Sequence, residues 1–131
     1  MVDLQVTITG ADTHPVDSTE MAFRSAAVLA TREAVGLAAP VLLEPVMALE
    51  IIVPDEHMGD VLGDLNGRRG RIKEMNAAEA AQVVHAEVPL SELFGYSTNL
   101  RSLSKGRASY SMEPHLFEVV PETLKEKILN R

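Results

Sequence analysis

Hydrophobic residues in the segment after Pro54 recur with the period of a helix. They stand at positions i, i+3, i+4 and i+7 and are Met58, Val61, Leu62 and Leu65. Two acidic residues follow Pro54, and Gly67 ends the pattern, as is common at the start and end of a helix. The pattern predicts a short amphipathic helix that buries one face.

Segments on both sides of this helix alternate with the period of two that is typical of strands. They are residues 46–53, 71–75, 83–88 and 107–113, with residues 76–81 predicted as a loop. The residues predicted to point inward on the last two strands are Val84, Ala86, Val88, Ala108, Tyr110 and Met112.

A second helical stretch lies between the last two strands. Pro89 opens a short helix, a cap at Ser97 or Thr98 starts a second set of turns, and Gly106 ends them. The order of elements is therefore βαββαβ, which predicts an α+β, ferredoxin-like sandwich with two helices on one face of an antiparallel sheet. Pro121 starts a predicted tail helix.

Residues 1–40 show a different pattern. Residues 2–9 alternate strictly and predict a half-buried strand, with residues 13–16 pairing back on it as a hairpin. Asp17 and Glu20 read as a capping box for one long helix over residues 18–35, which Gly36 ends. These elements predict a partial α/β domain.

Two prolines mark a predicted domain boundary. Pro40 and Pro45 hold the residues between them extended, because proline fixes φ and restricts the residue before it. Residues 41–45 are therefore predicted to be a linker, with the second domain at 46–131.

Composition narrows the function classes. The chain has 131 residues, no cysteine, five aromatic residues and a net charge of −7. Disulfides, thiolate zinc sites and thiol nucleophiles are thereby excluded. The negative net charge disfavours non-specific nucleic-acid binding. Five aromatic residues are too few to form a platform on which successive bases stack. The absence of any apolar run near 18 residues predicts a soluble, cytoplasmic protein that does not enter membranes.

No catalytic or metal-binding constellation is evident. The chain has neither a phosphate-binding loop of the G-x-x-x-x-G-K-[ST] type nor a G-x-S-x-G elbow, and its four histidines lack the i, i+4 spacing of a helical metal site. Four cations within six residues stand out instead, namely Arg68, Arg69, Arg71 and Lys73. They predict contact with a polyanion, although exposed cations near a helix C-terminus also complement the helix dipole and aid solubility.

Several long stretches of the sequence resemble bacterial elongation factor G. They are VDSTEMAF (16–23), VLLEP (41–45), GDVLGDLNGRRG (59–70), AEVPLSELFGY (86–96) and LRSLSKGRASY (100–110). The resemblance implies that residues 1–40 are the later part of the fourth domain and residues 46–131 the fifth domain with its tail helix. The chain would then be a fragment of a longer factor.

The resemblance also implies roles for particular residues. His14 occupies the tip of the fourth domain, which reaches the decoding centre with its A-site tRNA, although Pro15 departs from the acidic residue usual in the family. Arg68, Arg69 and Arg71 would contact large-subunit rRNA near the stalk base and its ribosomal protein. GTP and Mg²⁺ would bind only a nucleotide-binding domain that this chain lacks. The parent would be a GTPase that translocates tRNA and mRNA or recycles ribosomes.

Two other classes of function stay open at this point. A free-standing ferredoxin-like regulatory module would bind a small ligand in a polar pocket, and a small hydrolase would need a nucleophile or an anion cradle. An unpaired edge at residues 2–9 would also favour a dimer of the fragment.

Overall fold

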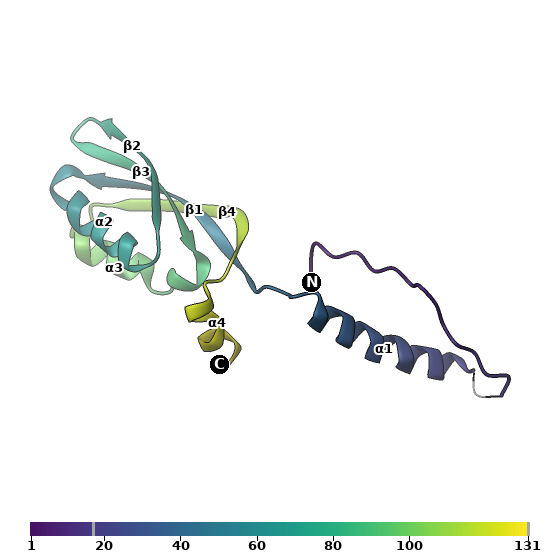
Figure 1. Cartoon of the computed structure of the whole chain (residues 1–131). Helices are drawn as coiled ribbons and strands as arrows, with labels where there is room; N and C mark the ends of the chain where they lie inside the picture. The colour runs from purple at the N-terminus through teal and green to yellow at the C-terminus, as the bar shows by residue number, and fades with distance from the viewer. Residues whose placement is uncertain (17, 131) are drawn as a thin grey trace. The chain divides into compact units, whose positions relative to one another are not determined.

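A computed structural model describes residues 1–16 and 18–130. The chain divides into two compact units, Met1–Pro40 and Val41–Arg131, and each is described by itself. Figure 1 shows a long helix with an extended segment in the first unit and a sheet with helices in the second.

The C-terminal unit is built on one sheet of four strands. The strands are β1 (Leu43–Pro54), β2 (Arg71–Ala78), β3 (Ala81–Pro89) and β4 (Ser109–Val119). Their order is β2-β3-β1-β4, and every neighbouring pair is antiparallel. Helices α2 (Met58–Gly67) and α3 (Tyr96–Ser104) both cover the same face of the sheet, as Figure 1 shows. The predicted βαββαβ sandwich is confirmed.

The core lies between the two helices and this face of the sheet. Val61 and Leu65 of α2 are fully buried, while Met58 and Leu62 are half-buried against them, so the predicted apolar face of the helix is confirmed. The strand residues in the core are Met47, Leu49, Ile51, Val53, Val84, Ala86 and Val88. The inward side of β3 is therefore the predicted one.

The hairpin between β2 and β3 is tighter than predicted. Residues 76–78 continue β2 instead of forming a loop, and only Glu79 and Ala80 make the turn. Ala80 has a φ of 59°, a left-handed conformation at the second central residue of the turn that lets the chain reverse within two residues. The small alanines at Ala78 and Ala81 pair directly across the turn. Their lack of strand propensity hid this extension in the sequence.

The predicted inward side of β4 is only partly correct. Tyr110 packs against the core, but Met112 is 47% exposed even though its partner Leu49 is buried. As an edge strand, β4 has a neighbouring strand on one side only, so alternation along it does not ensure burial. The strand also runs past residue 113 to Val119.

Short helical turns replace parts of the predicted second helix. A 3-10 turn, η2 (Leu90–Glu92), follows Pro89, and α3 starts at Tyr96 after Gly95, whose φ is 72°. The cap is therefore Gly95 instead of Ser97 or Thr98, because the chain needs a left-handed residue to re-enter a helix here. Lys105 and Gly106, both with positive φ, end α3 at the predicted place.

The remaining elements flank the sheet. A second 3-10 turn, η1 (Asp55–His57), precedes α2, and the tail helix α4 (Glu122–Leu129) follows Pro121 as predicted. Leu124 and Ile128 are half-buried, whereas Leu129 is 62% exposed.

The N-terminal unit contains one helix, α1 (Glu20–Leu37). Its N-cap is Thr19, whose Oγ1 accepts a hydrogen bond from the N–H of Ala22 at 3.1 Å, and Glu20 pairs with Arg24. The predicted cap at Asp17 falls outside the described residues. The helix continues through Gly36, because a glycine on an exposed helix costs only about 1 kcal/mol.

The predicted strand and hairpin of this unit are wrong. Residues 2–9 are extended and exposed, and neither they nor residues 13–16 form a strand in the described part of the chain. A strand needs a hydrogen-bonding partner as well as an alternating pattern. No residue of α1 is buried, so this unit has no core of its own among its described residues. Between α1 and β1, residues 38–42 lie outside regular structure, compared with the predicted linker at 41–45.

Replacing Tyr96 by phenylalanine is expected to stabilise the protein by about 1–2 kcal/mol at pH 7. The side chain is 1% exposed, and its hydroxyl is buried with no hydrogen-bond partner among the described residues, which is a cost that phenylalanine removes. Its ring meets Tyr110 edge-on, with centroids 5.1 Å apart, a contact that phenylalanine keeps. Urea unfolding of the two proteins measures the difference, with Tyr110→Phe as the control.

The same substitution should reduce the loss of stability in alkali. Burial raises the pKa of Tyr96 above its ordinary value of 10.0. Above that pH the unfolded chain releases this proton while the folded protein keeps it, so stability falls by up to about 1.4 kcal/mol per pH unit. The advantage of Tyr96→Phe should therefore widen as the pH rises through 10.0. A constant difference from pH 8 to 11 would contradict this account.

Candidate functional site

The basic turn, residues 68–73, connects the end of α2 to the start of β2 and carries the four predicted cations. The N–H of Gly70 donates to the carbonyl of Leu65 at 2.8 Å, which folds the chain sharply back under the helix. Arg69 has a φ of 58°, a conformation that glycine usually occupies at the end of a helix. The turn is thus a tight helix stop that holds an arginine in a strained position.

Arg68 points into the protein. Its Nε donates to Asp64 at 3.0 Å, and its Nη1 donates to the backbone carbonyls of Glu92 and Phe94. The guanidinium carbon lies 5.1 Å from the centre of the Tyr96 ring, within the range of a cation–π contact. Only 12% of the side chain is exposed. Arg68 therefore joins α2 to the segment that leads into α3.

Arg69 forms an ion pair with a nearly buried carboxylate. Its two terminal nitrogens donate to the two carboxylate oxygens of Glu44 at 2.7 and 3.1 Å, and its Nε donates to Glu92 at 3.0 Å. The Glu44 side chain is only 9% exposed. The hydrogen bond to Glu44 raises the pKa of Arg69, so the guanidinium stays charged. This two-pronged pairing fixes the start of β1 to the turn.

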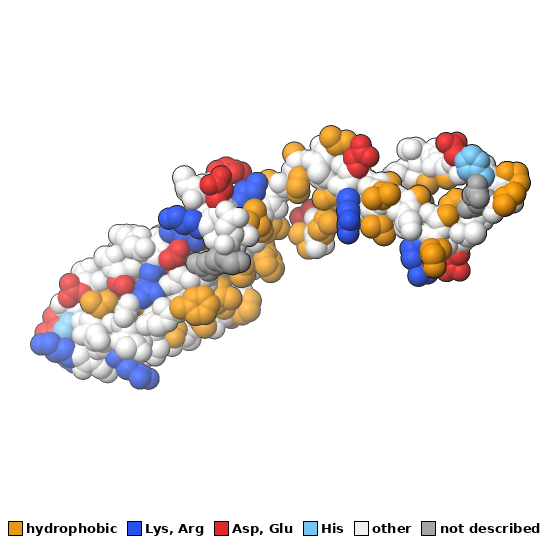
Figure 2. Space-filling model, turned by 90° about the horizontal axis from the view of Figure 1, so that it is seen from below, with side chains coloured by type: hydrophobic (Ala, Val, Ile, Leu, Met, Phe, Trp, Pro, Cys, Tyr) orange, Lys and Arg blue, Asp and Glu red, His pale blue; other side chains and the backbone are white. Residues whose placement is uncertain are grey.

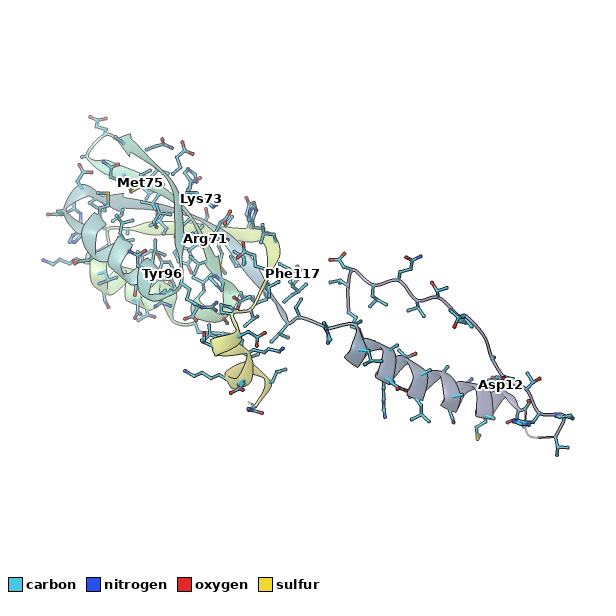
Figure 3. The ribbon with its side chains drawn as sticks, in the orientation of Figure 1. Asp12, Arg71, Lys73, Met75, Tyr96 and Phe117 are labelled. Carbon is cyan, nitrogen blue, oxygen red and sulfur yellow. The ribbon has the colours of Figure 1, made fainter. Side chains whose placement is uncertain are left out.

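Arg71 and Lys73 lie farther out. Arg71 pairs with Glu87 at 2.9 Å and with Glu118, and the hydrogen bond to Glu118 raises its pKa. Lys73 approaches Glu87 at 3.6 Å. About half of each side chain remains exposed, 51% and 53%. Figure 3 shows both on β2, followed by Met75. They are the two cations of the turn that a large partner can reach.

The sequence therefore showed where the cations of the basic turn lie, but not which of them are buried in ion pairs and which are exposed. The carboxylates that hold its arginines stand far away in the chain, at Glu44, Glu92 and Glu118. The one local signal was the i, i+4 spacing of Asp64 and Arg68, which is typical of an ion pair on a helix.

His14 belongs to the N-terminal unit. Its side chain is exposed, its backbone N–H donates to Ser18 Oγ at 2.6 Å, and its carbonyl accepts from the N–H of Ser18 at 3.2 Å. These bonds form a closed turn just before α1. The turn leaves the imidazole of His14 in solvent.

A cavity of about 200 Å³ lies beside the basic turn. The charged residues around it are Glu44, Arg69, Arg71, Glu87 and Glu118. These groups pair with one another, and the volume is below the roughly 300–1,000 Å³ of small-molecule sites. The cavity is an ion-paired corner of the sheet and is poorly suited to a small ligand.

Other charges are dispersed. Figure 2 shows acidic and basic side chains interspersed over the C-terminal unit, with no single positive field on the visible face. Arg107 pairs with Glu56.

Within residues 1–16 and 18–130, no cluster of histidine, aspartate or glutamate is placed to hold a metal ion. In the same described residues, no helix is long and apolar enough to cross a membrane.

Comparison with known proteins gives matches along nearly the whole chain. Residues 1–39 match the family model "Elongation factor G, domain IV", and residues 41–128 match "Elongation factor G C-terminus". A crystal structure of a protein from Thermus thermophilus is 44% identical in sequence and superposes with a TM-score of 0.76. The match covers 89% of this chain and 18% of that one, so this chain spans less than a fifth of that protein's length.

Proposed function

This chain belongs to the elongation factor G family, and we propose that it forms the C-terminal part through which such a factor docks on the ribosome during translation. The observation that carries the proposal is the pair of adjacent matches, to domain IV and to the C-terminus, in the order of the chain. The identity of 44% to a much longer protein supports it. A translation factor works in the cytoplasm, which is the proposed location.

In this proposal, the GTPase activity of the whole factor belongs to a part of the parent protein other than these 131 residues. GTP and Mg²⁺ bind a nucleotide-binding domain elsewhere in the parent, and that domain drives translocation of tRNA and mRNA or ribosome recycling. The 131 residues here supply contacts and rigidity and need no cofactor. His14, exposed at a closed turn, is the proposed contact to the decoding centre and its A-site tRNA.

Within the basic turn, the proposed contacts to large-subunit rRNA divide between two roles. Arg71 and Lys73 are half exposed and approach phosphates directly. Arg68 and Arg69 are engaged inside the protein, so they hold the shape of the turn and reach phosphate only by giving up their present partners. The neighbouring stalk-base protein is the proposed second partner.

The two alternatives gain no support from the structure. A small-ligand module needs a roomy polar pocket, and the cavity beside the basic turn is small and is lined by charged groups that pair with one another. A hydrolase needs a nucleophile with an adjacent base. The hydroxyl of Ser104, a buried serine of the C-terminal unit, donates to the carbonyl of Leu100 and accepts from the N–H of Ala108, so it is used in the backbone of α3 and the residues that follow.

Binding of the chain to purified bacterial large ribosomal subunits tests the proposal. Replacing Arg71 and Lys73 together by alanine should weaken binding about 5- to 30-fold. The fall of log K with the logarithm of the salt concentration should also become less steep by about 1–2, because up to two phosphate contacts are lost. Co-sedimentation over a series of salt concentrations measures both quantities.

Arg24→Ala is the matched control, since it removes an exposed, ion-paired arginine from α1. Unchanged affinity and slope in the double variant would show that the turn does not contact rRNA. A wild-type chain that fails to bind the subunits would overturn the proposed function itself.

A further inference from the structure

Phe94 is the most exposed large hydrophobic side chain of the C-terminal unit, within the residues that the structure describes. It lies between η2 and α3, and 81% of its surface is open to solvent. Scattered exposed hydrophobic residues are common and need no explanation. The segment that carries Phe94, however, is held in place by a buried arginine.

Arg68 fixes the backbone on both sides of the ring. It donates hydrogen bonds to the carbonyls of Glu92 and of Phe94 itself, and its own side chain is held by Asp64. Leu93 packs against the core, and its carbonyl accepts from the N–H of Tyr96 at 3.1 Å. The aromatic ring is therefore presented on an ordered backbone, so a partner that binds it has little loop entropy to remove.

The surroundings of the ring indicate the kind of partner. Gly95 follows it and carries no side chain that could cover the ring. Leu93 is turned into the core and Leu90 is 38% exposed, which leaves the ring without a broad apolar surround. Protein interfaces have a contiguous apolar core. A lone exposed ring on an ordered backbone better fits one unstacked base of an RNA, because stacking needs only one open π face.

We propose that Phe94 stacks on one unpaired base of the RNA to which this chain docks. The proposal rests on the proposed function, which supplies the RNA. It assigns Phe94 a direct contact and makes Arg68 the positioning residue that holds its loop.

Four variants of the full chain test the stacking contact by co-sedimentation with purified large ribosomal subunits. Phe94→Ala and Phe94→Leu should both weaken binding about 5- to 150-fold, which corresponds to the roughly 1–3 kcal/mol of one stacked base at 1.4 kcal/mol per tenfold. Phe94→Trp keeps a π face and should bind within about threefold of the wild type. Phe117→Ala removes another exposed phenylalanine, 68% exposed, and should leave binding unchanged.

Each other outcome has a definite meaning. If Phe94→Leu binds as well as the wild type while Phe94→Ala does not, the ring enters an apolar protein pocket and stacking is wrong. If Phe94→Ala binds normally, the proposal fails while the docking function stands. If the wild-type chain does not bind, both fail. Circular dichroism confirms that each variant is folded, which its exposed position leads us to expect.

Discussion

Replacing Arg69 by alanine is expected to lower the free energy of unfolding by about 2–4 kcal/mol, because it leaves the buried carboxylate of Glu44 without its partner. The pair is not fully buried, since 27% of the Arg69 side chain is exposed, and the expected loss is reduced accordingly. Urea unfolding followed by circular dichroism measures the change.

Two further variants separate the ion pair from the backbone strain at this position. Arg69→Gly loses the same contacts but suits the φ of 58°, so it should be about 1 kcal/mol more stable than Arg69→Ala. Adding Glu44→Gln to Arg69→Ala should cost less than the sum of the two single changes, because the carboxylate that was left unpaired is then neutral. Arg71→Ala, which removes a half-exposed arginine, should have little effect. Equal losses for Arg69→Ala and Arg71→Ala would refute the role of the pair.

Gly70→Ala is expected to destabilise the protein by about 2–3 kcal/mol. A Cβ on Gly70 would stand 2.7 Å from the carbonyl oxygen of Leu65 and 3.2 Å from Cγ2 of Val88. The first of these atoms belongs to the backbone that accepts the hydrogen bond closing the turn, so it cannot move aside without opening that bond. Thermal and urea unfolding both report the loss.

Gly63→Ala provides the matched control. This glycine lies within α2, and nothing approaches within 4 Å of its Cβ position, so alanine should stabilise the helix by about 0.5–1 kcal/mol. The two changes add the same methyl group to the same helix region with opposite expected signs. Destabilisation of similar size by both would show that close packing at Gly70 is not the cause.

Periodicity predicted the elements that bury one face, for a physical reason. The buried pair Val61 and Leu65, and the inward side of β3, follow a pattern that the burial itself imposes. Residues 2–9 carry an equally clear pattern and form no strand, because alternation fixes which side is apolar but supplies no partner for the backbone. Met112 shows the same limit at a sheet edge.

The candidate site could be located from the sequence but not resolved. The sequence shows four cations within six residues, and the structure places them at the end of α2 and the start of β2. Which of them face solvent depends on Glu44, Glu92 and Glu118, and only the folded sheet brings these carboxylates to the turn. Phe94 carried no signal at all, since its exposure results from the way Arg68 holds its loop.

The strand order has a consequence for how the protein is made. The β2–β3 hairpin closes between near neighbours, as at Ala78 and Ala81, and can form early in synthesis. The central strand β1 also needs β4, and Leu43 at its start pairs with Val119 near the end of the unit. One edge of β1 therefore stays unpaired until the last strand has left the ribosome. During that interval the nascent chain exposes an apolar strand edge, which makes the unit vulnerable to misfolding until β4 has emerged.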